Sequence, residues 1–451
     1  MTELLYLGAA VLFILGLKQL SGPRTARRGN ALAAAGMLLA VIVTLVETDV
    51  LSWWAIVAGI AVGAIVGGAL AIRVQMTSMP QLVAAFNGFG GAASALVALF
   101  ELERTAADLP METAIVVVLS LLIGTVTFTG SFVAFGKLQG LITGRPIGLP
   151  GGQALNALLA LAAVGAGVWA VIGDSTLPYW VALGIAATIG FTGVLPIGGA
   201  DMPVVISLLN SLSGIAASMA GFVIGNQALI VGGALVGAAG LILTVQMGEA
   251  MNRSLANVLF SGFGGSSGAV EMSDKPVNRA TPDDVAIALA YASSVVFVPG
   301  YGLAVAQAQY AVRDLATELE KRDIDVGYAI HPVAGRMPGH MNVLLAEADV
   351  PYDQLFDLEQ SNPKFAQTDV VLVIGANDVV NPSARDDAAS PIYGMPILEV
   401  DKARNVVVVK RSLSPGFAGI DNPLFYENET MMLFADGKDA LESVLSAMDQ
   451  V

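Results

Sequence analysis

The feature that most constrains the fold of this chain is a succession of long apolar runs, which fills the sequence up to residue 250. A transmembrane helix needs ~20 predominantly apolar residues, because backbone polar groups in the hydrocarbon layer must be satisfied within the segment. Short polar or Gly/Pro breaks separate the runs. We therefore predict nine transmembrane helices, near residues 4–21, 31–47, 52–74, 80–100, 113–135, 154–173, 178–196, 202–222 and 228–248.

Composition agrees with a membrane protein, since 55% of the residues are hydrophobic and only 13% are charged. The net charge of −15 excludes a nucleic-acid-binding chain, which would carry a basic patch. There are no cysteines, so disulfides, iron–sulfur clusters, thiolate zinc sites and cysteine nucleophiles are excluded. Any redox chemistry must therefore use an organic cofactor, and we expect no metal.

Positive charge alternates between the loops that join the predicted helices. Every Lys and Arg before residue 250 except Arg104 falls on one side: Lys18, Arg24, Arg27, Arg28, Arg73, Lys137 and Arg145. The positive-inside rule places that side in the cytoplasm. We therefore expect the N-terminus outside and everything after the ninth helix in the cytoplasm.

The pattern changes after the ninth apolar run. Residues 251–275 are rich in Gly and Ser and are predicted to form a connector. Beyond them, a helical pattern at 303–322 is interspersed with β-branched runs, and we predict strands at 295–298, 325–330, 370–374, 396–400, 406–409 and 431–434. This alternation predicts a doubly wound, Rossmann-like α/β domain with a parallel sheet. The predicted domains are thus a membrane bundle at 1–250, the connector at 251–275 and an α/β domain at 276–451.

The sharpest motif of the α/β domain follows its first predicted strand. There, Gly300-Tyr301-Gly302 leads into a helix whose apolar positions recur three and four apart, at Val305, Ala308, Val312, Leu315 and Leu319. In a dinucleotide-binding turn the glycines allow a tight turn and close approach to a pyrophosphate. The context favours dinucleotide binding, and the alternative is a glycine turn without a cofactor.

Two further features favour NADP(H) over NAD(H). The strand at 325–330 is followed by His331, where NAD-specific folds place a carboxylate for the ribose hydroxyl. The strand at 406–409 runs into Lys410-Arg411-Ser412, two cations and a hydroxyl that suit a 2′-phosphate. The alternative for this cluster is a solvated strand end.

With these motifs, the chain resembles the β subunit family of proton-translocating NAD(P) transhydrogenases over essentially its whole length. The stretches that carry the resemblance are GYGLAVAQAQ at 300–309, IHPVAGRMPGHMNV at 330–343, VIGAND at 373–378, KRS at 410–412, GGADMPVV at 198–205 and MNRS at 251–254. The resemblance implies hydride transfer from NADH to NADP⁺, coupled to inward proton movement. NADP(H) would bind this chain and NAD(H) a partner α subunit with extra membrane helices. It also implies a dimer of heteromers in the bacterial inner membrane, with the C-terminal domain in the cytoplasm.

The resemblance also implies the residues of the cofactor site. By position these are Gly300, Tyr301, Gly302, Ala304, Val305, Gly335, Arg336, Met337, Pro338, Gly339, His340, Gly375, Asn377, Asp378, Lys410, Arg411, Ser412, Gly416, Phe417 and Gly419. Asp378 and Arg336 would position the reacting groups. Phe417 stands where many relatives carry Tyr, so a hydrogen bond from that hydroxyl is not expected here.

The proton pathway departs from the family pattern at one position. Asn87 stands where some relatives carry a histidine, and an amide cannot hold a proton at physiological pH. Either a partner's helix supplies the titrating group, or waters and other polar residues suffice. The candidates in this chain are Asn87, Asp201, Asn210, Ser213 and Arg253, although Asp201 could also lie only at the cytoplasmic rim.

Two other functions are compatible with a membrane bundle joined to a nucleotide-binding domain. One is a channel or transporter gated by the cytoplasmic domain, which would bind the cofactor without turnover. The other is a membrane-anchored reductase, for which a single span would suffice.

Overall fold

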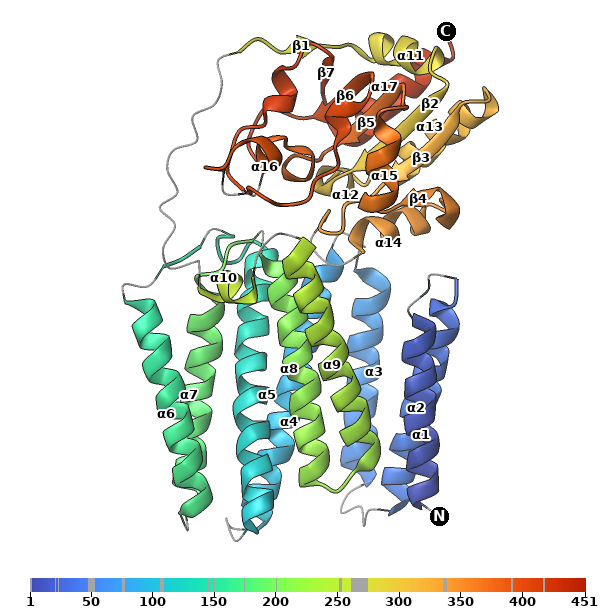
Figure 1. The fold of residues 1–451 in the computed structure, drawn as a ribbon. Helices are drawn as coiled ribbons and strands as arrows, with labels where there is room; N and C mark the ends of the chain where they lie inside the picture. The colour runs from blue at the N-terminus through green and yellow to red at the C-terminus, as the bar shows by residue number, and fades with distance from the viewer. Residues whose placement is uncertain are drawn as a thin grey trace. The chain divides into compact units, whose positions relative to one another are not determined.

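The computed structural model describes residues 2–20, 22, 24–47, 53–74, 78–105, 109–144, 146–148, 151–173, 175–199, 201–250, 254–260, 275–335, 339–390, 392–416 and 418–451. The chain divides into two compact units, one made of the long helices and one built on a β-sheet (Figure 1). In the described residues, nine helices are long and apolar enough to cross a membrane. The prediction of nine transmembrane helices is confirmed.

The helices of the membrane unit closely follow the predicted runs. They are α1 (Thr2–Leu20), α2 (Ala26–Glu47), α3 (Trp53–Arg73), α4 (Met79–Arg104), α5 (Met111–Leu138), α6 (Gly152–Ile172), α7 (Leu177–Val194), α8 (Met202–Val223) and α9 (Gln227–Ala250). A short helix, α10 (Leu255–Phe260), lies within the predicted connector. Residues 251–253 and 261–274 of that connector fall outside the described residues.

Small residues let the central helices approach closely. A Cβ added at Gly91 of α4 would lie 2.6 Å from the carbonyl oxygen of Gly124 on α5, so neither position accepts a larger residue. Nearby, the Ser120 hydroxyl on α5 donates to the carbonyl oxygen of Ser94 on α4 and to that of Ala216 on α8, at 3.0 and 3.4 Å. Close packing and interhelical hydrogen bonds replace the hydrophobic effect, which cannot drive helix association in lipid.

The second unit is built on a seven-stranded sheet. Its strands are β1 (Asn278–Arg279), β2 (Ser294–Pro299), β3 (Asp325–Ala329), β4 (Leu355–Phe356), β5 (Val370–Ile374), β6 (Asn405–Lys410) and β7 (Thr430–Phe434). Their order is β1-β7-β6-β5-β2-β3-β4 and all pairs are parallel. The chain runs outward from β2 to β3 on one side and continues from β5 on the other, so the switch point of the sheet lies between β2 and β5.

Helices cover both faces of the sheet, as expected for parallel strands. They are α11 (Pro282–Ala290), α12 (Tyr301–Val305), α13 (Gln309–Lys321), α14 (His340–Glu347), α15 (Leu358–Phe365), α16 (Ser383–Asp386) and α17 (Gly437–Met448). On one face, Phe365 of α15 and the segments 398–400 and 424–425 pack over alternate strand residues such as Val373. Helices α13 and α17 contact each other and the strands β3 and β6 (Figure 1). The prediction of a Rossmann-like domain is confirmed.

Two predicted elements are wrong. The apolar run Pro396–Val400 is not a strand, because Pro396 has no amide hydrogen and the Leu398 amide bonds the Val379 carbonyl oxygen instead of a neighbouring strand. The apolar residues of this run belong to a loop that covers one face of the sheet. The single helix predicted for 303–322 is two helices, α12 and α13, because Gln307 between them adopts a left-handed backbone conformation with φ of 51°.

Candidate nucleotide-binding site

The turn after β2 lies in direct backbone contact with the turn after β5. The amide of Gly300 donates to the carbonyl oxygen of Ile374 and that of Gly302 donates to the carbonyl oxygen of Gly375, both at 2.9 Å. A Cβ at Gly300 would lie 2.4 Å from the backbone of Ala376, and one at Gly375 would lie 2.4 Å from the Cα of Gly302. Glycine is therefore required on both turns. The crevice at the carboxyl ends of strands beside a switch point is where open α/β sheets bind ligands.

The helical segment that follows this turn buries the predicted face except at its first position. Ala308, Val312, Leu315 and Leu319 are fully buried as predicted, whereas Val305 is 46% exposed and Leu303 and Ala304 are buried instead. The break at Gln307 ends α12 after five residues and rotates Val305 out of the core. Tyr301 is the first residue of α12, and its ring centroid lies 6.3 Å from that of His340. The first residue of α14 thus lies beside the turn after β2.

The third strand, β3, leads into a buried histidine. His331 is 1% exposed, and its Nδ1 accepts a hydrogen bond from the Val333 amide at 3.2 Å. Its Nε2 therefore carries the hydrogen and donates to the carbonyl oxygen of Pro396 at 2.7 Å. Burial lowers the pKa of His331 to about 4, although the bond to Pro396 opposes the shift, so the ring is neutral near pH 7.

The loop after His331 contains two glycines with left-handed backbone angles. Gly335 has φ of 110°, and a Cβ there would lie 2.6 Å from His340 Nδ1. Gly339 has φ of 67° and no atom closer than 4.0 Å to an added Cβ, so space remains beside it. The predicted site residues Arg336, Met337 and Pro338 fall outside the described residues.

Asn377 and Asp378 follow β5 and organise the loop after β6. The Asp378 carboxylate accepts a hydrogen bond from the Ala418 amide at 2.9 Å, and a Cβ at Gly416 would lie 2.4 Å from its Oδ1. With the Asn377 carboxamide oxygen turned toward its donors, it accepts from the Gly416 amide at 2.7 Å and from Lys410 Nζ at 3.2 Å. These contacts hold Gly416 and Ala418 against the end of β5.

Lys410, at the end of β6, turns inward rather than to solvent. Its ammonium donates to the Ser414 carbonyl oxygen at 2.9 Å and lies 4.6 Å from the centre of the Phe425 ring. Desolvation lowers the pKa of Lys410 to about 8, and the carboxylates of Asp378 and Asp421 partly oppose the shift. A cation held this way suits an anionic ligand.

The neighbours of Lys410 are placed differently. Arg411 and Ser412 are both exposed, and the Ser412 hydroxyl lies 2.9 Å from that of Ser414. Gly419 has φ of 67° and nothing within 4 Å of an added Cβ. Phe417 falls outside the described residues. Lys410 thus lies beside Asn377, while Arg411 and Ser412 offer an exposed cation and hydroxyl next to it.

Comparison with known proteins identifies the chain. The sequence model of the NAD(P) transhydrogenase beta subunit matches residues 2–447. Two proteins called NAD(P) transhydrogenase subunit beta, both from Rhodospirillum rubrum, are each 48% identical over 460 aligned residues, which cover 100% of this chain and 99% of theirs. The chain belongs to the NAD(P) transhydrogenase beta subunit family. The transhydrogenase name implies a nicotinamide nucleotide, an alpha subunit partner and a membrane context.

Further polar residues support the site of this transhydrogenase subunit, and the sequence analysis did not select them. Buried Asn422 donates to the backbone oxygen of Asn377 at 3.1 Å and accepts from the Leu424 amide, while buried Asn381 donates to the carbonyl oxygen of Asp421 at 3.0 Å. Both asparagines adjoin prolines, which marks them as turn residues but gives no sign of these long-range bonds.

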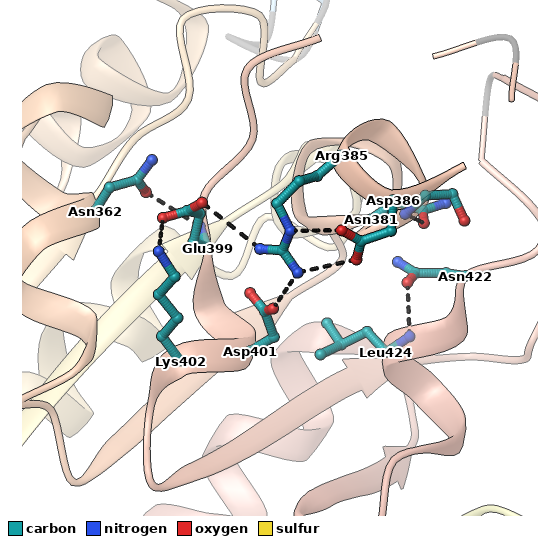
Figure 2. Close-up of polar contacts among 10 residues, drawn as sticks. Asn362, Asn381, Arg385, Asp386, Glu399, Asp401, Lys402, Asn422 and Leu424 are labelled. Atoms are coloured by element: carbon teal, nitrogen blue, oxygen red, sulfur yellow. Dashed lines mark hydrogen bonds and ion pairs between the residues drawn. The ribbon is translucent and has the colours of Figure 1, made fainter. Parts of the chain in front are cut away.

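An ion-pair cluster fixes the segment that follows Asn381 (Figure 2). Arg385 binds Asp386 at 2.9 Å and Asp401 at 2.8 Å, and it lies 3.6 Å from Glu399, which also pairs with Lys402. The Glu399 amide donates to the Asn362 side chain at 3.1 Å. The cluster ties residues 385–402 to α15 and needs no cofactor to be satisfied.

In the membrane unit, the structure brings together only some of the predicted pathway residues. Asn87 donates to the Ser131 hydroxyl at 3.0 Å, and Ser213 donates to the Asn87 carbonyl oxygen at 3.1 Å. Ser131 was not predicted, because it lies 44 positions away in the sequence. Asp201 is buried at the start of α8, and Asn210 is exposed on the described chain. Arg253 falls outside the described residues.

Proposed function

We propose that this chain binds NADP(H) and, with a partner α subunit that holds NAD(H), catalyses hydride transfer from NADH to NADP⁺ coupled to inward proton movement. The observation that carries the proposal is the glycine contact at the switch point of the sheet, in a chain of the transhydrogenase beta subunit family. When bound, the nicotinamide cofactor supplies the hydride chemistry. The protein contributes binding, alignment and exclusion of water.

The residues present suit a dinucleotide phosphate. The Gly300–Gly302 turn and Gly339 offer backbone without side chains, and Lys410 offers a desolvated cation beside Asn377. Arg411 and Ser412 add an exposed cation and hydroxyl, which suits a 2′-phosphate. His331 stands where an NAD-specific site carries an acid, and its neutral ring does not repel a phosphate. These features support NADP(H) rather than NAD(H).

Asp378 and Asn377 would act through the loop at 414–419. Because the Ala418 amide bonds the Asp378 carboxylate and the Gly416 amide bonds the Asn377 carboxamide, this loop is held over the carboxyl ends of the strands. We infer that this contact closes the loop on bound cofactor and keeps water from the reacting end. Arg336, Met337 and Pro338 would line the same cleft.

In the membrane, Asn87, Ser131 and Ser213 form the polar contact between α4, α5 and α8 through which protons would pass. None of these three side chains titrates near pH 7, so water or a partner's helix supplies the titrating group there. Asp201 provides a carboxylate at one end of α8. With Asn210 and Arg253 it completes the proposed pathway, and the α/β domain would lie in the cytoplasm of a bacterium with the complex in its inner membrane. A dimer of heteromers would supply the partner chains.

Nucleotide selectivity tests the cofactor proposal directly. The full chain in detergent should bind NADP⁺ and NADPH more tightly than NAD⁺ and NADH. Replacing Lys410 and Arg411 together by Ala should weaken NADP(H) binding by about 2–5 kcal/mol, given ~1.5–3 per hydrogen bond to a charged group. The control is K364A, because Lys364 lies on α15 with its ammonium over the Phe356 ring. Equal affinity for the two nucleotides in the wild-type chain would contradict the proposal.

A further inference from the structure

Lys137 and Asp201 are the only buried Lys, Arg, Asp or Glu residues in the described parts of the chain. Lys137 lies in the last turn of α5 and is 4% exposed, and Asp201 directly precedes α8 and is 7% exposed. Burying a charge in a membrane protein is costly unless other groups compensate it, so such residues commonly carry function. Lys137 takes part neither in the proposed nucleotide site around Gly300 nor in the contacts among Asn87, Ser131 and Ser213.

The ammonium of Lys137 caps the end of another helix. It donates to the carbonyl oxygens of Leu195 and Ile197, at 2.5 and 2.7 Å, and these residues directly follow α7. The last carbonyls of a helix have no partner within the helix and carry partial negative charge. A lysine is suited to satisfy them, and here it comes from a neighbouring helix.

Backbone bonds hold the same turn from a second direction. The Ile147 amide donates to the Leu195 carbonyl oxygen at 3.3 Å, and the Gly199 amide donates to that of Gly144 at 2.8 Å. The Leu195 oxygen therefore accepts from Lys137 and from Ile147. Residues 195–199 are thereby attached both to the end of α5 and to the segment that follows it.

This turn leads straight into Asp201. The Asp201 amide donates to the Gly198 carbonyl oxygen at 3.1 Å, and its own carbonyl oxygen accepts from the Val205 amide at 3.1 Å, so its backbone is fixed between the turn and α8. Its carboxylate does not cap the helix. Because only three residues separate Ile197 from Asp201, any displacement of the turn displaces the carboxylate.

We propose that Lys137 is a positioning residue for the coupled reaction, which pins the turn between α7 and α8 and thereby sets the place of the Asp201 carboxylate. The proposal rests on the proposed function, in which Asp201 belongs to the proton pathway. Both buried charges are linked to the turn at residues 195–199. Lys137 bonds its carbonyl oxygens, and Asp201 follows it closely in the sequence. Loss of the ammonium would remove this donor from the Ile197 carbonyl oxygen and leave the Leu195 oxygen with the Ile147 amide alone, so the turn before the buried carboxylate would be held less firmly.

The test uses the complex of this chain with its α subunit in lipid vesicles, in which hydride transfer and internal pH are recorded together. The variants are K137M, K137R, D201N and K137M/D201N. We expect K137M to lower the ratio of protons moved to hydride transferred at least fivefold, and K137R to restore most of it because the guanidinium keeps charge and donors. The double variant should have the ratio of D201N alone, since residues that act through one another are not additive.

Two controls separate this role from general damage. Ser120 also lies on α5, and its hydroxyl bonds two carbonyl oxygens that do not belong to the turn. S120A removes these bonds and should keep the wild-type ratio of protons to hydride. K137Q retains an amide donor without charge and should fall between K137M and K137R, which keeps the test valid if K137M does not assemble. A wild-type ratio in K137M or K137Q, or losses that multiply in the double variant, would overturn the proposal. A wild-type ratio in D201N would instead remove Asp201 from the proton pathway and the basis of the proposal with it.

Discussion

The Gly302 amide donates a hydrogen bond to the carbonyl oxygen of Gly375 at 2.9 Å, which joins the two turns on either side of the sheet's switch point. In many dinucleotide-binding turns the second glycine lets the backbone approach the pyrophosphate. Here Gly302 also approaches the backbone of the neighbouring turn, so the two turns form one unit. Whatever lies over the carboxyl end of β2 is therefore positioned by the turn after β5 as well.

Gly375→Ala should destabilise the α/β domain by about 2–5 kcal/mol, because the new methyl group adds a backbone clash to the strain of a left-handed residue. Gly419→Ala is the matched control, since Gly419 has a similar φ of 67° but nothing within 4 Å of an added Cβ. Strain alone should cost it about 1–2 kcal/mol. Hydrogen exchange of the β2 and β5 amides measures the stability lost in each variant. Equal losses would show that the contact between the turns contributes nothing to stability.

Lys410 should make NADP(H) affinity depend on pH above about 8. Below its lowered pKa of about 8 the ammonium is charged before binding, whereas above it each binding event must first restore the proton. Affinity should therefore be flat below pH 8 and fall up to tenfold per pH unit above it. K410R should abolish the loss of affinity above pH 8, because a guanidinium stays charged. Titration calorimetry in buffers of different ionisation enthalpy should also detect proton uptake above pH 8, which an unchanged signal would contradict.

His331 should make the α/β domain less stable in acid. Its folded pKa is about 4 and its usual value is about 6.5, so only the unfolded chain binds the proton between these values. Stability should therefore fall as pH drops from 6.5 to 4, by about 3 kcal/mol. H331Q should show a shallower acid dependence, although it starts from lower stability because the bonds to Val333 and Pro396 change. Parallel acid profiles of the two proteins would exclude His331 as the cause.

Asp378→Ala should loosen the loop at 414–419 by removing the acceptor of the Ala418 amide. A hydrogen bond to a charged acceptor contributes ~1.5–3 kcal/mol, so we expect NADP(H) to dissociate about tenfold faster or more. The control is D401N, which weakens the Arg385 cluster without touching this loop. Stopped-flow displacement gives the rates, and identical release from D378A and wild type would refute a closing role for this contact.

The sequence predicts most of the fold because two of its patterns are strong, the long apolar runs of the first unit and the short β-branched runs of the second. Apolar runs of ~20 residues match the thickness of the membrane, and β-branched runs such as Val406–Val409 favour central strands of a parallel sheet. The same logic fails at Pro396–Val400, where an apolar run is buried as loop because its backbone bonds Val379. It fails at Val305 because one left-handed residue, Gln307, ends the helix early.

The sequence predicts where a candidate site lies but not the contacts that assemble it. The strand-turn-helix pattern around Gly300 places a site at the end of β2, yet nothing in it shows that Gly302 bonds Gly375. The sequence predicts two cations and a hydroxyl for a phosphate at residues 410–412. It does not show that Lys410 lies beside Asn377 while Arg411 is exposed. Tertiary contacts of this kind join residues too far apart in the chain for any local pattern to reveal.

The most direct test of the central claim reconstitutes this chain with its α subunit in sealed vesicles whose α/β domains face the bath. Hydride transfer from NADH to NADP⁺ is measured as the NADPH separated from NADH in quenched samples, because the two reduced nucleotides absorb alike. A dye in the lumen records the pH there. Because protons should move from the side opposite the α/β domains to the side they face, the account predicts that NADP⁺ reduction makes the lumen alkaline, and that an uncoupler abolishes the pH change but not hydride transfer. Nucleotide binding with no hydride transfer, or transfer with no change in luminal pH, would contradict it.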